Sequence, residues 1–321
     1  MKKFLAIFLA AVMALGLVAC GEPAPAPVES TPVESTPAES APAESVPVEE
    51  PAEDVVKAAA MNYFASFPDD KHLIKVDGLF EKMDAGEDML IIDVRQPDAY
   101  AEGHLKGAVN VPYGPAVADA LEMIPDDVPL FVNCYTGQTS SQVVALLNIA
   151  GKFATNIQGG FNNGISKAEG FEAYITTDAA TLDPEGDYEV EDAIEDAIAD
   201  YFEAATTGEI KSFNFKPDAL KELVAAGDDT YTILSIRKAE DFAAGHIEGA
   251  MNIPFGKGMQ ERFAEIPTDK PVVVYCYSGQ TSSQTVATLR MLGYEAYSLA
   301  GGMGKEGGSG WLGAQGPVVT E

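Results

Sequence analysis

Compact apolar runs alternate with amphipathic stretches along most of the chain. Runs rich in leucine and β-branched residues, without a polar residue at every second position, cover Met89–Val94, Leu130–Asn133, Tyr231–Ile236 and Val272–Tyr275. Such continuous runs are typical of strands that are buried on both faces of a parallel sheet. Shorter runs at Thr155–Gln158 and Ala296–Leu299 predict one further strand each.

Amphipathic stretches around these runs predict helices. They cover Val76–Met83, Val143–Ala150, Pro217–Ala225 and Thr285–Leu292. Thr139–Gln142 and Thr281–Gln284 match the capping-box pattern, which predicts that two of these helices begin there. Strands that alternate with helices indicate an α/β fold with a mainly parallel sheet flanked by helices.

The second half of the chain repeats the first. The nine residues Cys134–Gln142 recur at Cys276–Gln284 with one change, Thr136 to Ser278. The same offset of 142 positions relates further pairs without insertion or deletion: Arg95 and Arg237, His104 and His246, Asn110 and Asn252, Gly159 and Gly301. We therefore expect two tandem copies of one α/β domain, at residues 55–177 and 190–321, joined by a linker at residues 178–189.

The first residues predict an export signal rather than a part of the fold. A basic start, Met1–Lys3, precedes an apolar run from Phe4 to Val18, which is too short for a spanning helix. The residues that close it, Leu17–Gly21, resemble the lipobox of bacterial lipoproteins. That resemblance implies removal of residues 1–19, acyl chains on Cys20, and a lipoprotein at the extracytoplasmic face of a bacterial cell membrane. The alternative is an ordinary signal peptide that is cleaved at another bond.

Composition extends this prediction to the next segment and limits the partners. Residues 20–54 consist almost entirely of Pro, Ala, Glu, Ser, Thr and Val, so we expect a disordered tether there rather than a domain. The whole chain carries 50 acidic and 20 basic residues, which gives a formal net charge of −30. Such a surface repels nucleic acid and anionic lipid headgroups, so neither is expected as a partner.

Two polar loops carry the candidate chemistry. Each begins with a cysteine after a predicted strand and leads toward a predicted helix: Cys134 with Tyr135, Thr136, Gly137, Gln138, Thr139 and Ser140, and Cys276 with Tyr277, Ser278, Gly279, Gln280, Thr281 and Ser282. A cysteine attacks only as its thiolate. Backbone N–H groups of such a loop and the positive end of the following helix stabilise an anion, and the loop hydroxyls can donate to the same sulfur.

Two other interpretations of these cysteines are open. A disulfide between Cys134 and Cys276 requires Cα atoms within about 7 Å of each other. Each cysteine can instead be a small buried hydrophobic residue. The polar context and its repetition favour two free, functional thiols.

Three motifs in order resemble the rhodanese (sulfurtransferase) family. They are Asp93–Arg95, Tyr100–Pro112 with the sequence YAEGHLKGAVNVP, and Cys134–Ser140. The second copy repeats them at Ile236–Arg237, Phe242–Pro254 and Cys276–Ser282. The resemblance implies that both cysteines are catalytic. Each would take the outer sulfur of a small donor as a persulfide and pass it to a thiol or cyanide acceptor. It also implies that no metal or organic cofactor is required.

The loops depart from the family pattern at one position. Many single-domain rhodaneses close the loop with arginine, where this chain has Thr139 and Thr281. A doubly charged donor such as thiosulfate would therefore meet only neutral donor groups, which leaves polysulfides and low-molecular-weight persulfides as alternatives. The copies also differ outside the loops, because Ser235 replaces Asp93 and Trp311 has Ile165 as its counterpart.

Neighbouring residues allow further roles. His104 and His246 are candidates for general bases, although a structural hydrogen-bonding role is the favoured interpretation. Arg95 and Arg237 are expected to pair with nearby carboxylates, namely Asp98, Glu240 and Asp241.

The loops bear on two other classes of function. Phosphatases with related loops clamp phosphate with an arginine where this chain has Ser140 or Ser282, so a phosphatase is not expected. The main alternative to an enzyme is a non-catalytic module that binds a partner or carries sulfur on degenerate rhodanese-like domains.

Overall fold

The structure is a computed structural model that describes residues 51–320. Cys20 and the predicted signal and most of the predicted tether lie outside the described residues. One sheet comprises β1 (Leu73–Ile74), β2 (Leu90–Asp93), β4 (Ala108–Asn110), β5 (Leu130–Asn133) and β6 (Ala154–Ile157). The other comprises β8 (Asn214–Phe215), β9 (Thr232–Ser235), β10 (Met251–Asn252), β11 (Val272–Tyr275) and β12 (Ala296–Leu299).

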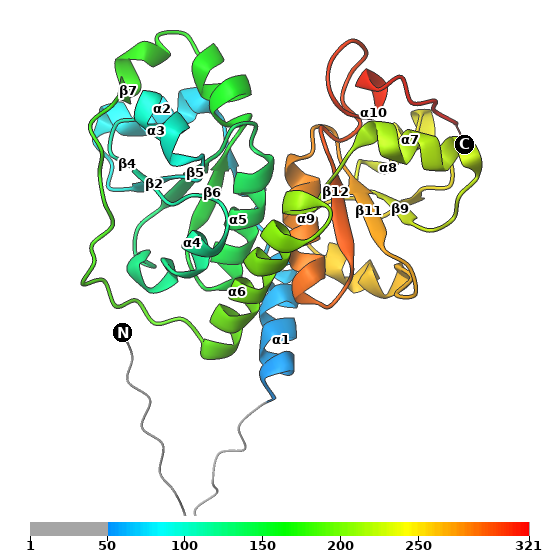
Figure 1. Ribbon diagram of the computed structural model, residues 1–321, viewed down its shortest axis with the longest axis horizontal. Helices are drawn as coiled ribbons and strands as arrows, with labels where there is room; N and C mark the ends of the chain where they lie inside the picture. Colours follow the sequence, from blue (N-terminus) through cyan, green and yellow to red (C-terminus); the bar gives the residue numbers. More distant parts are fainter. Residues whose placement is uncertain (1–50, 321) are drawn as a thin grey trace, which may run out of the picture. The chain divides into compact units, whose positions relative to one another are not determined.

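The two sheets have the same strand order. It is β1-β6-β5-β2-β4 in the first repeat and, read from the other edge, β8-β12-β11-β9-β10 in the second (Figure 1). Neighbouring strands are parallel in both sheets. A small antiparallel pair, β3 (His104–Leu105) with β7 (Ile175–Thr176), lies beside the first sheet. The predicted fold class is confirmed, and the predicted strands agree with the observed ones to within one residue at each end.

Helices cover both faces of each sheet. They are α1 (Ala52–Ala65), α2 (Val76–Ala85), α3 (Pro97–Glu102), α4 (Pro115–Ala118), α5 (Gln138–Ile149), α6 (Asp192–Thr207), α7 (Pro217–Ala226), α8 (Ala239–Ala244), α9 (Gln280–Met291) and α10 (Gly310–Gly313). Shorter helical turns are η1 (Leu121–Met123), η2 (Gly160–Gly164), η3 (Ile165–Lys167), η4 (Phe171–Tyr174), η5 (Lys211–Phe213) and η6 (Met259–Glu265). From residue 51 to residue 320, no helix combines the length and the apolar character needed to span a bilayer.

The helices that follow the cysteines begin earlier than predicted. The capping-box prediction is wrong, because α5 and α9 begin at Gln138 and Gln280, directly after Gly137 and Gly279. Both glycines are left-handed, with φ of 85° and 88°, and no side chain caps either helix. Glycine adopts this conformation without a steric penalty, so the chain turns at the glycine and enters the helix at once.

One hydrophobic core joins the two repeats. Alternate strand residues point toward it: Ile92 and Val132 from the first sheet, and Val272 and Val274 from the second. The helices α5 and α9 lie side by side between the sheets and contribute buried residues to the same core (Figure 1). The outer faces form separate cores, one beneath α2 and α3 and the other beneath α7 and α10.

The opening helix of each repeat packs against the other repeat. Helix α1 contacts α9 and η6, and α6 contacts α4. The Tyr63 hydroxyl of α1 donates to Oε1 of Gln284 at 3.2 Å, and the Tyr201 hydroxyl of α6 donates to Oε1 of Gln142 at 2.9 Å. Phe64 adds edge-to-face aromatic contacts with the second repeat. The two repeats are therefore expected to stabilise each other.

Truncation of Phe64 tests whether the packing of α1 against the second repeat stabilises that repeat. Removing a buried phenylalanine costs about 3–5 kcal/mol, and the lost contacts here include Phe255 and Phe263 of the second repeat. Trp311, the single tryptophan, is buried in the second repeat, so its fluorescence reports on that repeat during urea unfolding. We expect a lower midpoint in Phe64→Ala and little change in Phe153→Ala, whose side chain is 64% exposed. An unchanged Trp311 transition in Phe64→Ala would show that α1 does not stabilise the second repeat.

Candidate active site

Both loop cysteines lie at the carboxyl end of a central strand. Cys134 follows β5, which lies between β6 and β2, and Cys276 follows β11, which lies between β9 and β12. Both are free thiols with 1% of their surface exposed, so the alternative of a disulfide between them does not hold. The carboxyl edge is where open α/β sheets bind ligands.

Each sulfur lies within hydrogen-bonding distance of one backbone N–H group and one serine hydroxyl. The N–H of Gly137 and the Ser140 hydroxyl each lie 3.1 Å from Cys134 Sγ. In the second repeat the N–H of Gly279 and the Ser282 hydroxyl lie 3.1 and 3.5 Å from Cys276 Sγ. Donors aimed at the sulfur stabilise its anion, whether as thiolate or as persulfide.

The other predicted loop hydroxyls do not reach the sulfur. Within the described residues, Thr136, Thr139, Ser278 and Thr281 make no hydrogen bond to either cysteine. For Thr139 and Thr281 the reason is the early start of α5 and α9, which places this sixth loop residue within the first turn. Successive helical residues point about 100° apart, so the serine faces the sulfur and the threonine before it does not.

The remaining loop residues make contacts away from the sulfur. Tyr135 and Tyr277 are exposed, and their hydroxyls accept the backbone N–H groups of Gln96 and Lys238 at 3.3 and 3.2 Å. The two loop glutamines reach the other repeat. Oε1 of Gln138 accepts the N–H of Gly301, and Oε1 of Gln280 accepts the N–H of Gly159, each at 3.0 Å.

A glycine pair closes each loop from the far side. Gly160 and Gly302 are left-handed, and a Cβ on either would lie 2.6 Å from the carbonyl oxygen of the loop cysteine. The residues that follow, Phe161 and Met303, donate their N–H groups to those same carbonyl oxygens at 2.7 Å. Only glycine allows such a close approach of two backbones.

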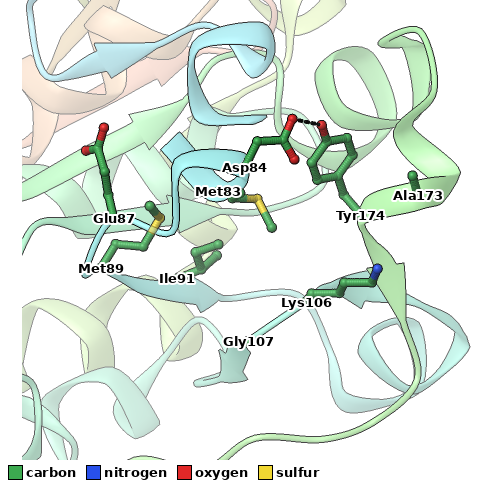
Figure 2. A pocket seen from close by; sticks show the side chains of 9 residues that line it. All are labelled: Met83, Asp84, Glu87, Met89, Ile91, Lys106, Gly107, Ala173 and Tyr174. Carbon is green, nitrogen blue, oxygen red and sulfur yellow. Dashed lines mark hydrogen bonds between the residues drawn. The ribbon is translucent and has the colours of Figure 1, made fainter. Parts of the chain in front are cut away.

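Cys276 lines a cavity of 260 Å³ that both repeats form. Lys71, Leu73 and Gln158 come from the first repeat, and Lys238 and Phe255 come from the second. A larger cavity of 530 Å³, lined by Met83, Asp84, Lys106, Tyr174 and others, contains no cysteine (Figure 2). The smaller cavity is the better candidate for a reactive site because it contains the nucleophile.

The two arginines differ from the predicted pairing. Arg95 pairs with Asp93, not with Asp98, and its guanidinium lies 2.6 Å from that buried carboxylate and 2.8 Å from the carbonyl of Gly103. The prediction was wrong because Asp93, the last residue of β2 and two residues before Arg95, brings its carboxylate against the guanidinium. Arg237 has no such partner, since Ser235 replaces the aspartate, but it makes the equivalent bond to the carbonyl of Gly245.

Glu240 and Asp241, the two carboxylates that were expected to pair with Arg237, contact other residues. Glu240 lies 3.8 Å from Lys238, and Asp241 accepts a hydrogen bond from the Tyr277 hydroxyl. Neither forms a salt bridge with Arg237 within residues 51–320. The expected pairing of Arg237 was therefore wrong too.

The histidines lie against backbone carbonyls rather than against the thiols. The ring nitrogens of His104 are 2.8 and 3.1 Å from the carbonyl oxygens of Tyr100 and Asp178. Nδ1 of His246 is 2.9 Å from the carbonyl oxygen of Phe242. Among the described side chains, no three His, Cys, Asp or Glu residues are grouped as metal ligands would be.

Sequence reasoning missed residues that support the Cys134 loop. The Ser140 hydroxyl lies 2.5 Å from Oδ1 of Asn156, whose Nδ2 donates to Oε1 of Gln280 at 3.1 Å. Burial raises the pKa of Tyr113 well above its usual value, so its hydroxyl stays protonated and donates to Gln142. Tyr113 directly follows the GHLKGAVNVP motif, but nothing in the pattern shows that it turns toward α5.

Comparison with known proteins defines the class of this fold and site. The family model for the rhodanese-like domain matches residues 77–167 and 216–305. The uncharacterized protein YqhL of Bacillus subtilis is 38% identical over 104 residues, which are 31% of this chain and 82% of that protein. The thiosulfate sulfurtransferase GlpE of Pseudomonas entomophila is 34% identical over 91 residues, which are 28% of this chain and 74% of that protein.

A third relative supports the same class. The thiosulfate sulfurtransferase PspE of Escherichia coli is 38% identical over 72 residues, which are 22% of this chain and 68% of that protein. The chain belongs to the rhodanese-like family, with two tandem rhodanese-like domains. Family membership and these relatives support sulfur transfer as the general activity.

Substitution of the closing glycine tests the loop architecture. Gly302→Ala and Gly307→Ala both place alanine at a left-handed residue, with φ of 60° and 66°. A Cβ at Gly302 meets the Cys276 carbonyl and the Gly279 nitrogen, whereas a Cβ at Gly307 meets nothing within 4 Å. We expect Gly302→Ala to be less stable than Gly307→Ala by about 1–3 kcal/mol in urea unfolding. Amide hydrogen exchange of residues 276–280 should also accelerate only in Gly302→Ala, and equal effects of the two variants would contradict this account.

Proposed function

We propose that Cys134 and Cys276 are the nucleophiles of a sulfurtransferase that works through a cysteine persulfide. The observation that carries this proposal is the pair of donors at each sulfur, an N–H group and a serine hydroxyl, at the carboxyl end of a central strand. These donors stabilise the anion needed for attack and the anion that the attack produces. Both repeats preserve the arrangement.

The reaction has two displacement steps. The cysteine thiolate attacks the outer sulfur of the donor, the sulfur–sulfur bond of the donor breaks, and its electron pair leaves with the remainder. That remainder is sulfite when the donor is thiosulfate and a shorter polysulfide when the donor is a polysulfide. An acceptor thiolate or cyanide then attacks the outer sulfur of the persulfide and regenerates the cysteine thiolate.

The range of donors includes thiosulfate, polysulfides and low-molecular-weight persulfides. Two relatives are named thiosulfate sulfurtransferases, which supports thiosulfate. The loops themselves contain no lysine or arginine, which supports donors of lower charge. Acceptors are small thiols or cyanide, and nucleic acid is not a partner.

We also propose that the protein acts outside the cytoplasm, on a bacterial membrane. Support comes from the basic start, the short apolar run and the small residues before Cys20. Lipid chains on Cys20 would anchor the mature protein, and residues 21–54 would connect the anchor to the rhodanese-like domains.

Exposure to a sulfur donor tests the covalent intermediate. Incubation with polysulfide or thiosulfate should add one sulfur atom to each active thiol, as seen by intact-protein mass spectrometry, and cyanide should remove it. Cys134→Ser and Cys276→Ser should each retain part of the turnover, and the double variant should retain none. Loss of all turnover in either single variant would mean that the two thiols act as one relay. Turnover in the double variant would exclude both cysteines as nucleophiles, and the absence of any persulfide would favour a non-catalytic binding module.

Replacement of Cys20 tests the proposed location. Cys20→Ala should remain unprocessed or be released from the membrane, because the acyl chains have no attachment site. Cell fractionation and the mass of the purified protein measure both outcomes. A variant that remains in the membrane fraction with the mature mass of the parent would contradict the lipoprotein proposal.

A further inference from the structure

Two basic side chains line the cavity at Cys276. Lys71 and Lys238 line the 260 Å³ cavity at Cys276, and this lining contains no carboxylate. Lys71 belongs to the first repeat, so the second repeat does not form this cavity alone. The Cys276 loop contains no arginine, but Lys71 and Lys238, from two other segments of the chain, lie beside it.

The segment that carries Lys71 is held against the second repeat. The residue is left-handed, with φ of 63°, and its carbonyl oxygen accepts a hydrogen bond from Nε2 of Gln284 at 3.2 Å. Just before it in the chain, the carbonyl of Phe64 accepts the N–H of Gly258 at 3.0 Å. These bonds fix the backbone of Lys71 beside the Cys276 loop.

The equivalent positions around Cys134 are uncharged. Ser212 matches Lys71, because it is also left-handed, with φ of 51°, and its carbonyl accepts Nε2 of Gln142 at 2.8 Å. Gln96 matches Lys238, because each donates its N–H to the hydroxyl of a loop tyrosine. The approximate symmetry of the repeats therefore places serine and glutamine where the Cys276 site has two lysines.

The buried arginines increase this difference. Arg95 is neutralised by Asp93 at 2.6 Å, whereas Arg237 faces Ser235 and its Nε finds no acceptor within residues 51–320. Two carboxylates offset part of the charge in the second repeat. Glu240 lies 3.8 Å from Lys238, and Asp241 bonds to the Tyr277 hydroxyl.

The difference in charge lies in the cavity lining itself. Lys71 and Lys238 line the cavity at Cys276, where the first repeat has Ser212 and Gln96 at the matching positions. Asp70 precedes Lys71 in the chain but does not line this cavity, and Lys211, next to Ser212, donates to backbone carbonyls of α6. The lining of the Cys276 cavity therefore carries two cations that their counterparts in the first repeat lack.

We propose that Cys276 forms a composite site, completed by Lys71 of the first repeat, which selects anionic sulfur donors, whereas the Cys134 site lacks this selectivity. The proposal rests on the sulfurtransferase function above. With thiosulfate, the lysines would attract the sulfonate end while Cys276 attacks the outer sulfur. The sulfur–sulfur bond then breaks, and sulfite leaves with the bonding electron pair. Each lysine that lines the cavity favours the approach of the dianion.

Two alkylating reagents that differ mainly in charge test the proposal without any transfer of sulfur from a donor. Iodoacetate is an anion and iodoacetamide is neutral, and both form a thioether with a thiolate. The full-length protein is treated with each reagent, and alkylation rates at Cys134 and Cys276 are measured by peptide mass spectrometry. We expect the ratio of the iodoacetate rate to the iodoacetamide rate to be higher at Cys276 than at Cys134. Added salt should reduce this difference, because it screens the lysines.

Charge variants assign the effect to Lys71. Lys71→Gln should lower the rate ratio at Cys276 about two- to fivefold, as expected for an exposed cation, and Lys71→Arg should retain it. Lys75→Gln is the matched control, because this exposed lysine is four residues away and does not line the cavity. Ser212→Lys should raise the ratio at Cys134. A ratio at Cys276 that Lys71→Gln leaves unchanged, or that Lys75→Gln lowers equally, would overturn the proposal.

A thiosulfate experiment separates this inference from the proposed function. Persulfide formation from thiosulfate should be faster at Cys276 than at Cys134 and should slow in Lys71→Gln. If persulfide forms at Cys276 at the same rate in Lys71→Gln, the composite site is wrong and the sulfurtransferase function stands. If no donor forms a persulfide while the alkylation ratio depends on Lys71 as expected, the anion-selective site stands and the sulfurtransferase function is wrong.

Discussion

The packing of α5 against α9 is the contact on which the rest of the described structure depends. Both helices begin directly after a cysteine loop, and nearly all of their residues are buried between the two sheets. Because they meet near their first turns, Gln138 and Gln280 reach across and accept the N–H groups of Gly301 and Gly159. Both bonds are part-buried, and such a hydrogen bond contributes about 0.5–1.5 kcal/mol. Each cysteine loop is thus held by the other repeat as well as by its own, and duplication of the domain contributes directly to the geometry of both sites.

The same frame allows the two sites to diverge. The carbonyl groups of Lys71 and Ser212 make equivalent bonds to glutamines of the opposite repeat, so the backbone position is fixed and the side chain is free to vary. The two repeats also differ in the residue that contacts the serine beside each cysteine. Asn156 links Ser140 to Gln280 of the second repeat, whereas its counterpart Ser298 bonds to Ser282 within its own repeat. Substitutions at such positions alter the charge or hydrogen bonding of one site without disturbing the contact between α5 and α9.

Much of the fold could be predicted from the sequence because its signals are local. Continuous apolar runs define the buried parallel strands, and the offset of 142 positions defines the repeat. The start of α5 was missed because the capping-box pattern at Thr139–Gln142 competes with a turn at Gly137, and the left-handed glycine decides where the helix begins. The partner of Arg95 was missed because both Asp93 and Asp98 are close to it in sequence, and only the end of β2 decides which carboxylate meets the guanidinium. The contacts between repeats were not predictable at all, because a repeat shows that two domains exist but not which surfaces they share.

The large negative charge of the chain makes local cations more important for the site, not less. A net charge of −30 opposes the approach of any anion from a distance. At physiological ionic strength, however, charges in solvent are largely screened beyond about 8 Å, and groups that line one cavity are screened less. The reactivity of an anionic donor at Cys276 is therefore governed by the few groups beside it, in particular Lys71 and Lys238 with the nearby carboxylate of Glu240. At Cys134 the counterparts of Lys71 and Lys238 are the neutral residues Ser212 and Gln96, so an uncharged donor or one of low charge has the advantage there.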